Sequence, residues 1–105
     1  MSGAHQGRRH EWRWRDYFES EGYEVVRAAA SRGAADLICI KHGQVLLVQC
    51  KRTAMPSPAE RRELARVARM LPGVAVPVIA RGHNLLRVTD DGTNPRRASP
   101  SPWTR

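Results

Sequence analysis

Three polar residues, Asp36, Gln49 and Lys51, have the side chains that metal-assisted hydrolysis of a phosphodiester uses. This chemistry needs a divalent cation held by oxygen atoms, and a positive group near the attacking water or the developing charge. Asp36 has an anionic oxygen, Gln49 a neutral carbonyl oxygen, and Lys51 an ammonium group. The backbone carbonyl of Cys50 lies beside Gln49 and is a further candidate ligand. These groups can act together only if the fold brings them to one place.

A short hairpin is predicted between Asp36 and Lys51. The stretches 34–40 and 44–52 are rich in Leu, Ile and Val, and the pair His42-Gly43 separates them. Two such runs joined by two residues of this kind are typical of a β-hairpin. The hairpin would carry the polar residues at its open end, away from the turn.

The register of this hairpin decides which side chains meet. With a two-residue loop, Lys41 lies opposite Gln44, the numbers of paired residues sum to 85, and Asp36 is predicted to lie directly opposite Gln49. Opposed residues share a face with Cβ atoms about 5 Å apart, and Lys51 projects from that same face. One cation could then contact both oxygens. The same pattern also fits an ordinary polar strand end with one salt bridge.

Glu11 is a candidate for a third acidic group. A helix is predicted over about residues 9–21, and Glu11 lies on one stripe of it with Trp14 and Phe18. An ionised side chain on an inward stripe is costly unless it is paired or bound to a metal. Two simpler interpretations stay open: Glu11 pairs with Arg15 one turn later, or it stabilises the helix N-terminus electrostatically.

The hydrophobic pattern predicts an α/β fold in the order αβββαββ, with a mixed sheet of about five strands flanked by helices. The predicted elements are a helix over about 9–21, strands over 23–28, 34–40 and 44–52, a helix over about 58–71, and strands over 74–80 and 85–89. Ser57 is the expected N-cap of the second helix, with Pro58 at its first position and Glu60 completing a capping box. The third strand is apolar on both faces, which favours a central position. Pro77 indicates that the fourth strand is an edge or irregular strand.

The charge of the chain favours a nucleic acid as partner. Among its 105 residues, 18 are Lys or Arg and 10 are Asp or Glu, which gives a formal net charge of +8. Phosphate neutralisation by basic side chains supplies much of the affinity for nucleic acids. There is no apolar run near the roughly 20 residues that a spanning helix needs, and the first residues do not resemble a signal peptide. We therefore expect a cytoplasmic protein without a membrane partner.

The two cysteines and the C-terminal segment complete the predicted organisation. Cys39 and Cys50 are not opposed in the predicted register, so we expect both thiols to be reduced and buried. Residues 92–105 contain prolines and arginines but no acid, and we expect a flexible basic tail there. Residues 1–91 would then form a single domain, which is small enough that a homodimer would not be surprising.

Over roughly residues 8–90 the sequence resembles the archaeal-type Holliday junction resolvases of the PD-(D/E)XK nuclease superfamily. The resemblance is carried by residues that occur in order with compatible spacings, namely Glu11, Val25-Val26-Arg27, Ser31, Asp36 and Gln49-Cys50-Lys51. It implies a restriction-endonuclease-like mixed sheet flanked by helices, a homodimer, and Mg²⁺ or Mn²⁺ as cofactor. It also implies paired cuts in a four-way DNA junction, which is branched double-stranded DNA.

The resemblance also implies roles for individual residues. Glu11, Asp36 and Gln49 match metal-site positions, beside the Cys50 carbonyl, and Lys51 matches the catalytic lysine. Ser31 matches a loop serine near the scissile phosphate and is counted with the catalytic residues. The arginines that we expect to contact DNA are Arg8, Arg9, Arg27, Arg32 and Arg52. For Arg27 the alternative is an ion pair with Glu24 or Glu11.

The sequence departs from the family pattern at two positions. Ala35 precedes Asp36 where the superfamily name has a proline. Gln49 stands where Glu or Asp is usual, and its neutral amide removes one negative charge from the site. We therefore expect weaker cation affinity and a preference for Mn²⁺.

The leading hypothesis is a metal-dependent, structure-selective DNA endonuclease that cleaves Holliday junctions. The alternatives are a nuclease of duplex DNA in repair or restriction, a non-catalytic DNA-binding module with the same fold, and an RNA-binding domain. The residues considered for a dimer interface lie on the second helix and could equally cover the sheet: Leu64, Val67, Met70 and Leu71.

Overall fold

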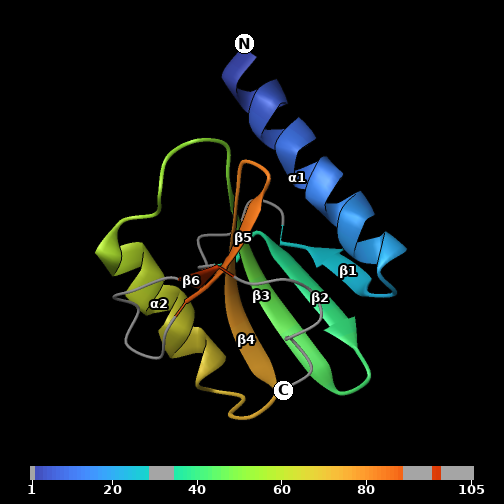
Figure 1. The fold of residues 1–105 in the computed structure, drawn as a ribbon, viewed down its shortest axis with the longest axis vertical. Coiled ribbons are helices and arrows are strands. Elements are labelled where there is room, and N and C mark those ends of the chain that lie inside the picture. The colour runs from blue at the N-terminus through green and yellow to red at the C-terminus, as the bar shows by residue number, and fades with distance from the viewer. Residues whose placement is uncertain (1, 29–34, 89–95, 98–105) are drawn as a thin grey trace.

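The computed structural model has a mixed β-sheet with helices packed on its two faces (Figure 1). It describes residues 2–28, 35–88 and 96–97, with side chains for 9–28 and 35–88. In chain order the elements are α1 (Ser2–Ser20), β1 (Glu24–Arg27), β2 (Leu37–Lys41), β3 (Gln44–Lys51), α2 (Pro58–Ala68), β4 (Ala75–Arg81), β5 (Asn84–Arg87) and β6 (Arg96–Arg97). The strands lie in the order β1-β2-β3-β4-β5-β6, and only the β3–β4 pair is parallel among the described strands. The predicted α/β class and the order αβββαββ are confirmed, with β6 added.

The β2–β3 hairpin has the predicted register from its turn to the start of β2. Lys41 pairs with Gln44, and the ladder continues to Leu37 opposite Val48. The loop residues His42 and Gly43 have φ values of 48° and 79°. A tight hairpin turn of the I′ type needs a positive φ at both central residues, which glycine adopts without strain. The turn therefore fixes the register of everything that follows on β3.

Two hydrophobic cores lie on opposite faces of the sheet. On the α1 face, Trp14 and Phe18 pack with alternate residues of the strands, including Leu46 and Val48 of β3. On the α2 face, the intervening Leu47 packs with the buried residues of α2 and with Ile79 and Val88. Strand β3 thus contributes to both cores, which confirms its predicted central position between two covered faces.

Helix α1 is longer than the sequence pattern predicts, because it begins at Ser2 rather than near residue 9. Its first turns extend past the sheet (Figure 1), so they need no inward apolar stripe of the kind that guided the prediction. Helix α1 ends at Ser20, and Gly22 terminates it as expected. The φ of 96° at Gly22 allows the Gly22 and Tyr23 amides to donate to the carbonyls of Glu19 and Phe18. This is a Schellman motif, and the Phe18 and Tyr23 rings pack across it.

Helix α2 begins as predicted and ends earlier. Ser57 accepts a hydrogen bond from the Glu60 amide, and the Glu60 carboxylate accepts one from the Ser57 amide, which is a complete capping box. The helix ends at Ala68, three residues before the predicted end. Leu64 is fully buried against the sheet, whereas Leu71 lies beyond the helix and is exposed.

Pro77 does not make β4 an edge strand, so that prediction is wrong. Strand β4 lies between β3 and β5. The carbonyl of Pro77 accepts a hydrogen bond from the Val88 amide at 3.0 Å. The amide and carbonyl of one strand residue point to the same side, so the missing N–H faces the β5 side. The N–H that Pro77 lacks would point just past Arg87, the last residue of β5. The proline therefore removes no hydrogen-bond donor to β3.

The described part of the predicted flexible tail is a strand. Arg96 and Arg97 form β6, which pairs with Arg87 and Leu86 of β5. These two residues supply partners to the edge of β5, and the flexible tail over residues 92–105 stays a prediction. The boundary after residue 91 stays a prediction.

Candidate active site

Asp36 lies at the point where β2 leaves the ladder. Its amide donates to the Val48 carbonyl at 2.7 Å, although Leu37 is already the residue opposite Val48. Two residues of one strand thus face one residue of β3, which is the arrangement of a β-bulge. The predicted direct pairing of Asp36 with Gln49 is therefore wrong, because the strand bends one residue before it. Bulges re-aim side chains, and here the bend turns the carboxylate toward the end of β3.

The Asp36 carboxylate is bound to the backbone of β3. Its Oδ2 accepts a hydrogen bond from the Cys50 amide at 2.8 Å. The carbonyl of Cys50 leaves the strand on the same side as this amide, because both groups of a strand residue point to one edge. The Cys50 carbonyl, which the sequence suggested as a ligand, therefore faces the edge that Asp36 occupies.

The environment of the Asp36 carboxyl group disfavours its ionised form. Burial is the largest effect and raises its pKa, the hydrogen bond from Cys50 lowers it, and the nearby Glu11 carboxylate raises it again. Lys51 and Arg27 lower the pKa by smaller amounts, and the balance is a raised value. An ionised Asp36 thus costs folding free energy at neutral pH, which a bound cation would offset.

Gln49 has a buried oxygen without a hydrogen-bond partner. Its Oε1 is the one buried side-chain nitrogen or oxygen atom for which the described residues supply no partner. Leaving a polar atom unpaired costs roughly 1–3 kcal/mol, and such atoms commonly indicate a missing ion or water. Gln49 adjoins Cys50, whose amide holds Asp36. A lone pair of Gln49 is therefore unused, which fits the expected role of this residue as a neutral oxygen ligand.

Lys51 contacts helix α2 through Glu60. The Lys51 Nζ lies 3.5 Å from Oε2 of Glu60, while Oε1 of the same carboxylate accepts the Ser57 amide. The first turn of α2 therefore positions the lysine at the end of β3. The sequence predicted Glu60 as a capping residue, but its ion pair with Lys51 depends on how the helix packs and was not predicted.

Glu11 and Arg27 form the other side of the site. Arg27 Nε donates to Glu11 Oε1 at 3.0 Å. Arg15 instead pairs with Asp16, and Glu11 lies in the middle of α1, so both simpler interpretations of Glu11 are wrong. Glu11 acts on the Asp36 pKa and is therefore close to it. The alternative that Arg27 pairs with Glu11 is the arrangement seen.

Two of the remaining predicted site residues, Arg9 and Arg52, line a separate pocket together with His10 and His83. Ser31 and Arg32 fall outside the described residues, as does the side chain of Arg8. Among the described residues no group of three His, Cys, Asp or Glu side chains could hold a metal. A cation here would depend on Gln49 and on backbone oxygen.

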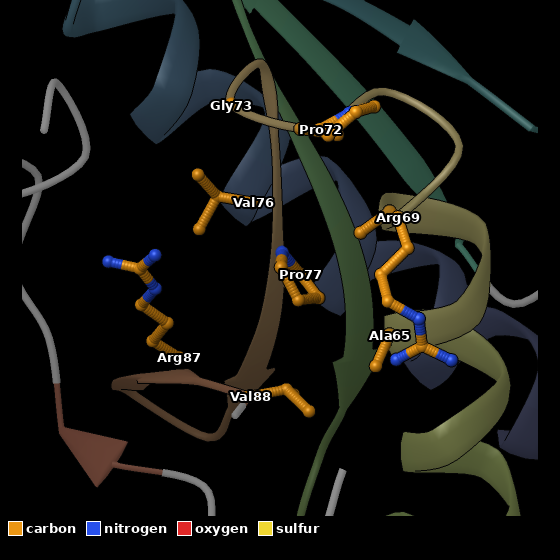
Figure 2. Close-up of a pocket in the computed structure, with 10 residues that line it drawn as sticks. Ala65, Arg69, Pro72, Gly73, Val76, Pro77, Arg87 and Val88 are labelled. Carbon is orange, nitrogen blue, oxygen red and sulfur yellow. The ribbon is translucent and has the colours of Figure 1, made fainter. Parts of the chain in front are cut away.

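A second hollow, of about 290 Å³, lies between α2 and strands β4 and β5 (Figure 2). Val76, Pro77 and Val88 line it, with Arg69 and Arg87 on its two sides. No carboxylate or carboxamide belongs to its described lining, so it lacks the oxygen ligands that a metal-dependent site needs.

The thiols take no part in this site's chemistry. Cys39 and Cys50 are both free, and Cys39 is buried as predicted, whereas the prediction that Cys50 is buried is wrong because this residue is only partly buried. Burial raises the pKa of Cys39 to about 12 and raises the pKa of Cys50 further, so neither is a thiolate at neutral pH.

The comparison with protein families decides the affiliation. The family described as archaeal Holliday junction resolvase (Hjc) matches residues 2–57, which is more than half of the chain. The chain belongs to the archaeal Holliday junction resolvase family. The matched range contains Glu11, Asp36, Gln49 and Lys51. Membership of the family places this chain among the nucleases.

A solved structure shows the same fold. It is Hjc of Archaeoglobus fulgidus, a Holliday junction resolvase from an archaeal hyperthermophile, with a TM-score of 0.60 and 18% sequence identity. The similarity covers 93% of this resolvase and 87% of the Archaeoglobus chain. The comparison with curated proteins gave no match. In the described part of the chain, neither helix has the length and apolar character to cross a bilayer.

Proposed function

We propose that this chain cleaves four-way DNA junctions by metal-dependent hydrolysis of a phosphodiester, as a homodimer. The observation that carries the metal dependence is the unpartnered buried Oε1 of Gln49, on the strand whose Cys50 amide binds the Asp36 carboxylate. The family supports the junction as substrate, and the net charge of +8 supports DNA as partner.

The donor set fits Mg²⁺ or Mn²⁺, because every candidate ligand is an oxygen. Asp36, Gln49, Glu11 and the Cys50 carbonyl would hold the ion, and Glu11 would exchange part of its contact with Arg27. Bound there, the ion supplies Lewis-acid activation of the phosphate and a lowered pKa for water.

The chain's own residues carry the remaining roles. Lys51, held by Glu60, donates to the attacking water or to the phosphate oxygen on which charge develops. Arg27, released from Glu11, clamps a phosphate through its guanidinium. Ser31 is assigned to the scissile phosphate by its match to the family.

A homodimer places two such sites for the paired cuts of a symmetric junction. The exposed apolar residues on the α2 side of the molecule are the proposed interface: Val26, Ile40, Met70 and Leu71. Leu64 does not belong to it, because it is buried in the core, and Val67 is partly buried there.

The test is cleavage of a labelled four-way junction beside a linear duplex of the same arm sequence, with Mg²⁺ and with Mn²⁺. We expect paired nicks in the junction and at least tenfold slower cleavage of the duplex. Asp36→Asn should lose at least a hundredfold in rate, since it removes the charge of the carboxylate that is bound to the β3 backbone. Activity that survives in Asp36→Asn would contradict the assigned site. Equal cleavage of both substrates would instead favour a duplex nuclease of repair or restriction.

One observation favours a second candidate, a non-catalytic DNA-binding module. Gln49 replaces a carboxylate, and the described residues contain no cluster of three acidic, His or Cys ligands. This candidate predicts that the protein retards a four-way junction with steep salt dependence but produces no nicks with either metal.

A further inference from the structure

We propose that a pocket beside α1 binds a backbone phosphate of the DNA other than the one that is cut. The proposal rests on the proposed function, because it assigns a second contact to the same substrate. The pocket has a volume of about 400 Å³ and is lined by Arg9, His10, Arg13, Arg52, Thr53 and His83.

The charge of the pocket selects an anion. The described lining contains Arg9, Arg13 and Arg52 and neither Asp nor Glu. Arg52 has a further interaction in the chain, so Arg9 and Arg13 are the proposed ligands of the anion. Like charges gathered in one concave site repel each other unless an anion lies between them. Guanidinium groups match phosphate oxygens with paired N–H donors, so the favoured anion is a phosphate.

Hydrogen bonds between distant segments hold the pocket in shape. Trp14 Nε1 donates to the Gly82 carbonyl at 3.2 Å, and the Gly82 amide donates to the Lys51 carbonyl at 2.9 Å. Arg81 Nε donates to the Thr53 carbonyl at 2.6 Å. Helix α1, the end of β3 and the β4–β5 turn are thus joined before any ligand arrives, which lowers the ordering cost of binding.

The pocket adjoins the backbone of Lys51, whose carbonyl accepts the amide of the lining residue Gly82, but it lies on a different side of α1 from Glu11. Arg9 and Arg13 are one turn apart, and each is two residues from Glu11, so they project from nearly the opposite side of the helix. Arg52 directly follows Lys51. DNA whose scissile phosphate lies by Lys51 therefore has neighbouring backbone within reach of the pocket.

The described lining contains no Phe, Tyr or Trp, so the large aromatic platforms on which bases commonly stack are missing from it. Contacts to phosphate alone position the DNA and carry no sequence information. The pocket should therefore raise affinity equally for junctions of any sequence.

The experiment measures how salt weakens binding of a labelled four-way junction to the full chain, by fluorescence anisotropy without a divalent metal. The double variant Arg9→Ala/Arg13→Ala should bind more weakly than the parent at every salt concentration. The slope of log Kd against the logarithm of the salt concentration should be smaller by about 0.9, which is the contribution of one phosphate contact. Affinity loss between 50 and 200 mM salt would then be about 3.5-fold smaller than for the parent.

The control is Arg62→Ala/Arg66→Ala, which removes the same charge from exposed residues of α2. Titration of the parent with inorganic phosphate, followed by the amide NMR signals of Thr53, Gly82 and His83, tests the pocket without DNA. Amide NMR signals of each variant that match those of the parent outside the substituted sites show that the variants are folded. Three results would each overturn the proposal. The slope could fall equally in the control variant, it could fall by about 1.8 in Arg9→Ala/Arg13→Ala, or the pocket amide signals could stay in place when phosphate is added.

Failure of the pocket differs from failure of the proposed function. If the parent cleaves the junction while the pocket variant keeps the parent slope, the second phosphate site is wrong and the nuclease stands. If the parent binds but never nicks, while the slope falls as expected, the pocket stands and catalysis is wrong.

Discussion

Gln49 stands where the family resemblance implies Glu or Asp, and a single substitution there tests whether its side chain binds a metal or only packs. The variant Gln49→Glu adds an anionic oxygen to the proposed ligand set. We expect it to bind Mn²⁺ at least about tenfold more tightly than the parent, or about 1.4 kcal/mol. Without metal it should melt at a lower temperature, because burial and Glu11 already disfavour charge at Asp36.

The measurement is the melting temperature as a function of Mn²⁺ concentration, which rises with binding to the folded state. Gln44→Glu is the matched control, since it makes the same change at the other end of β3. Equal Mn²⁺ stabilisation of the parent, Gln49→Glu and Gln44→Glu would remove Gln49 from the ligand set.

At the scale of elements, the first turn of α2 serves both the helix and Lys51. Glu60→Gln keeps an acceptor for the Ser57 amide, because a capping box accepts Gln, but it ends the ion pair with Lys51. Glu60→Ala loses both. We expect both variants to cleave junctions about tenfold more slowly, because Lys51 is no longer positioned.

Stability should separate the two variants. Glu60→Ala should lose about 1 kcal/mol of unfolding free energy with its cap, whereas Glu60→Gln should lose less, since a partly exposed ion pair contributes little. A rate that falls only in Glu60→Ala would show that Glu60 acts on the helix alone. Single-turnover cleavage and thermal melts decide this.

Elements with local signals were predictable from sequence, and those that depend on neighbours were not. The His42-Gly43 turn and the Ser57 capping box are local, so the hairpin register and the start of α2 were predicted. The bend at Asp36 and the place of Pro77 depend on which amides meet across strands, and they were predicted wrongly. The site residues were named from type and order, but their actual contacts, such as Asp36 with Cys50, follow from the bend.

At the scale of the whole molecule, apolar surface is left uncovered on the α2 side. Met70 and Leu71 are 64% and 48% exposed, and Val26 and Ile40 of the neighbouring strands are 47% and 42% exposed. Helix α2 covers the sheet nearer β4, so this surface has no partner within the described chain. Exposed apolar patches commonly mark interfaces, which supports the proposed dimer.

Leu71→Glu should therefore produce a monomer. A charge placed in an apolar interface costs about 3 kcal/mol or more, a weakening of dimerisation by more than a hundredfold. Met55→Glu is the control, because Met55 is also exposed, at 37%, but lies before the other end of α2. Sedimentation velocity over a range of concentrations would compare them with the parent.

The Leu71→Glu monomer should nick single strands of the junction and lose the coupled second cut, since the two sites no longer bind one substrate together. A parent that is monomeric at all concentrations would contradict the dimer, and a dimeric Leu71→Glu would move the interface elsewhere.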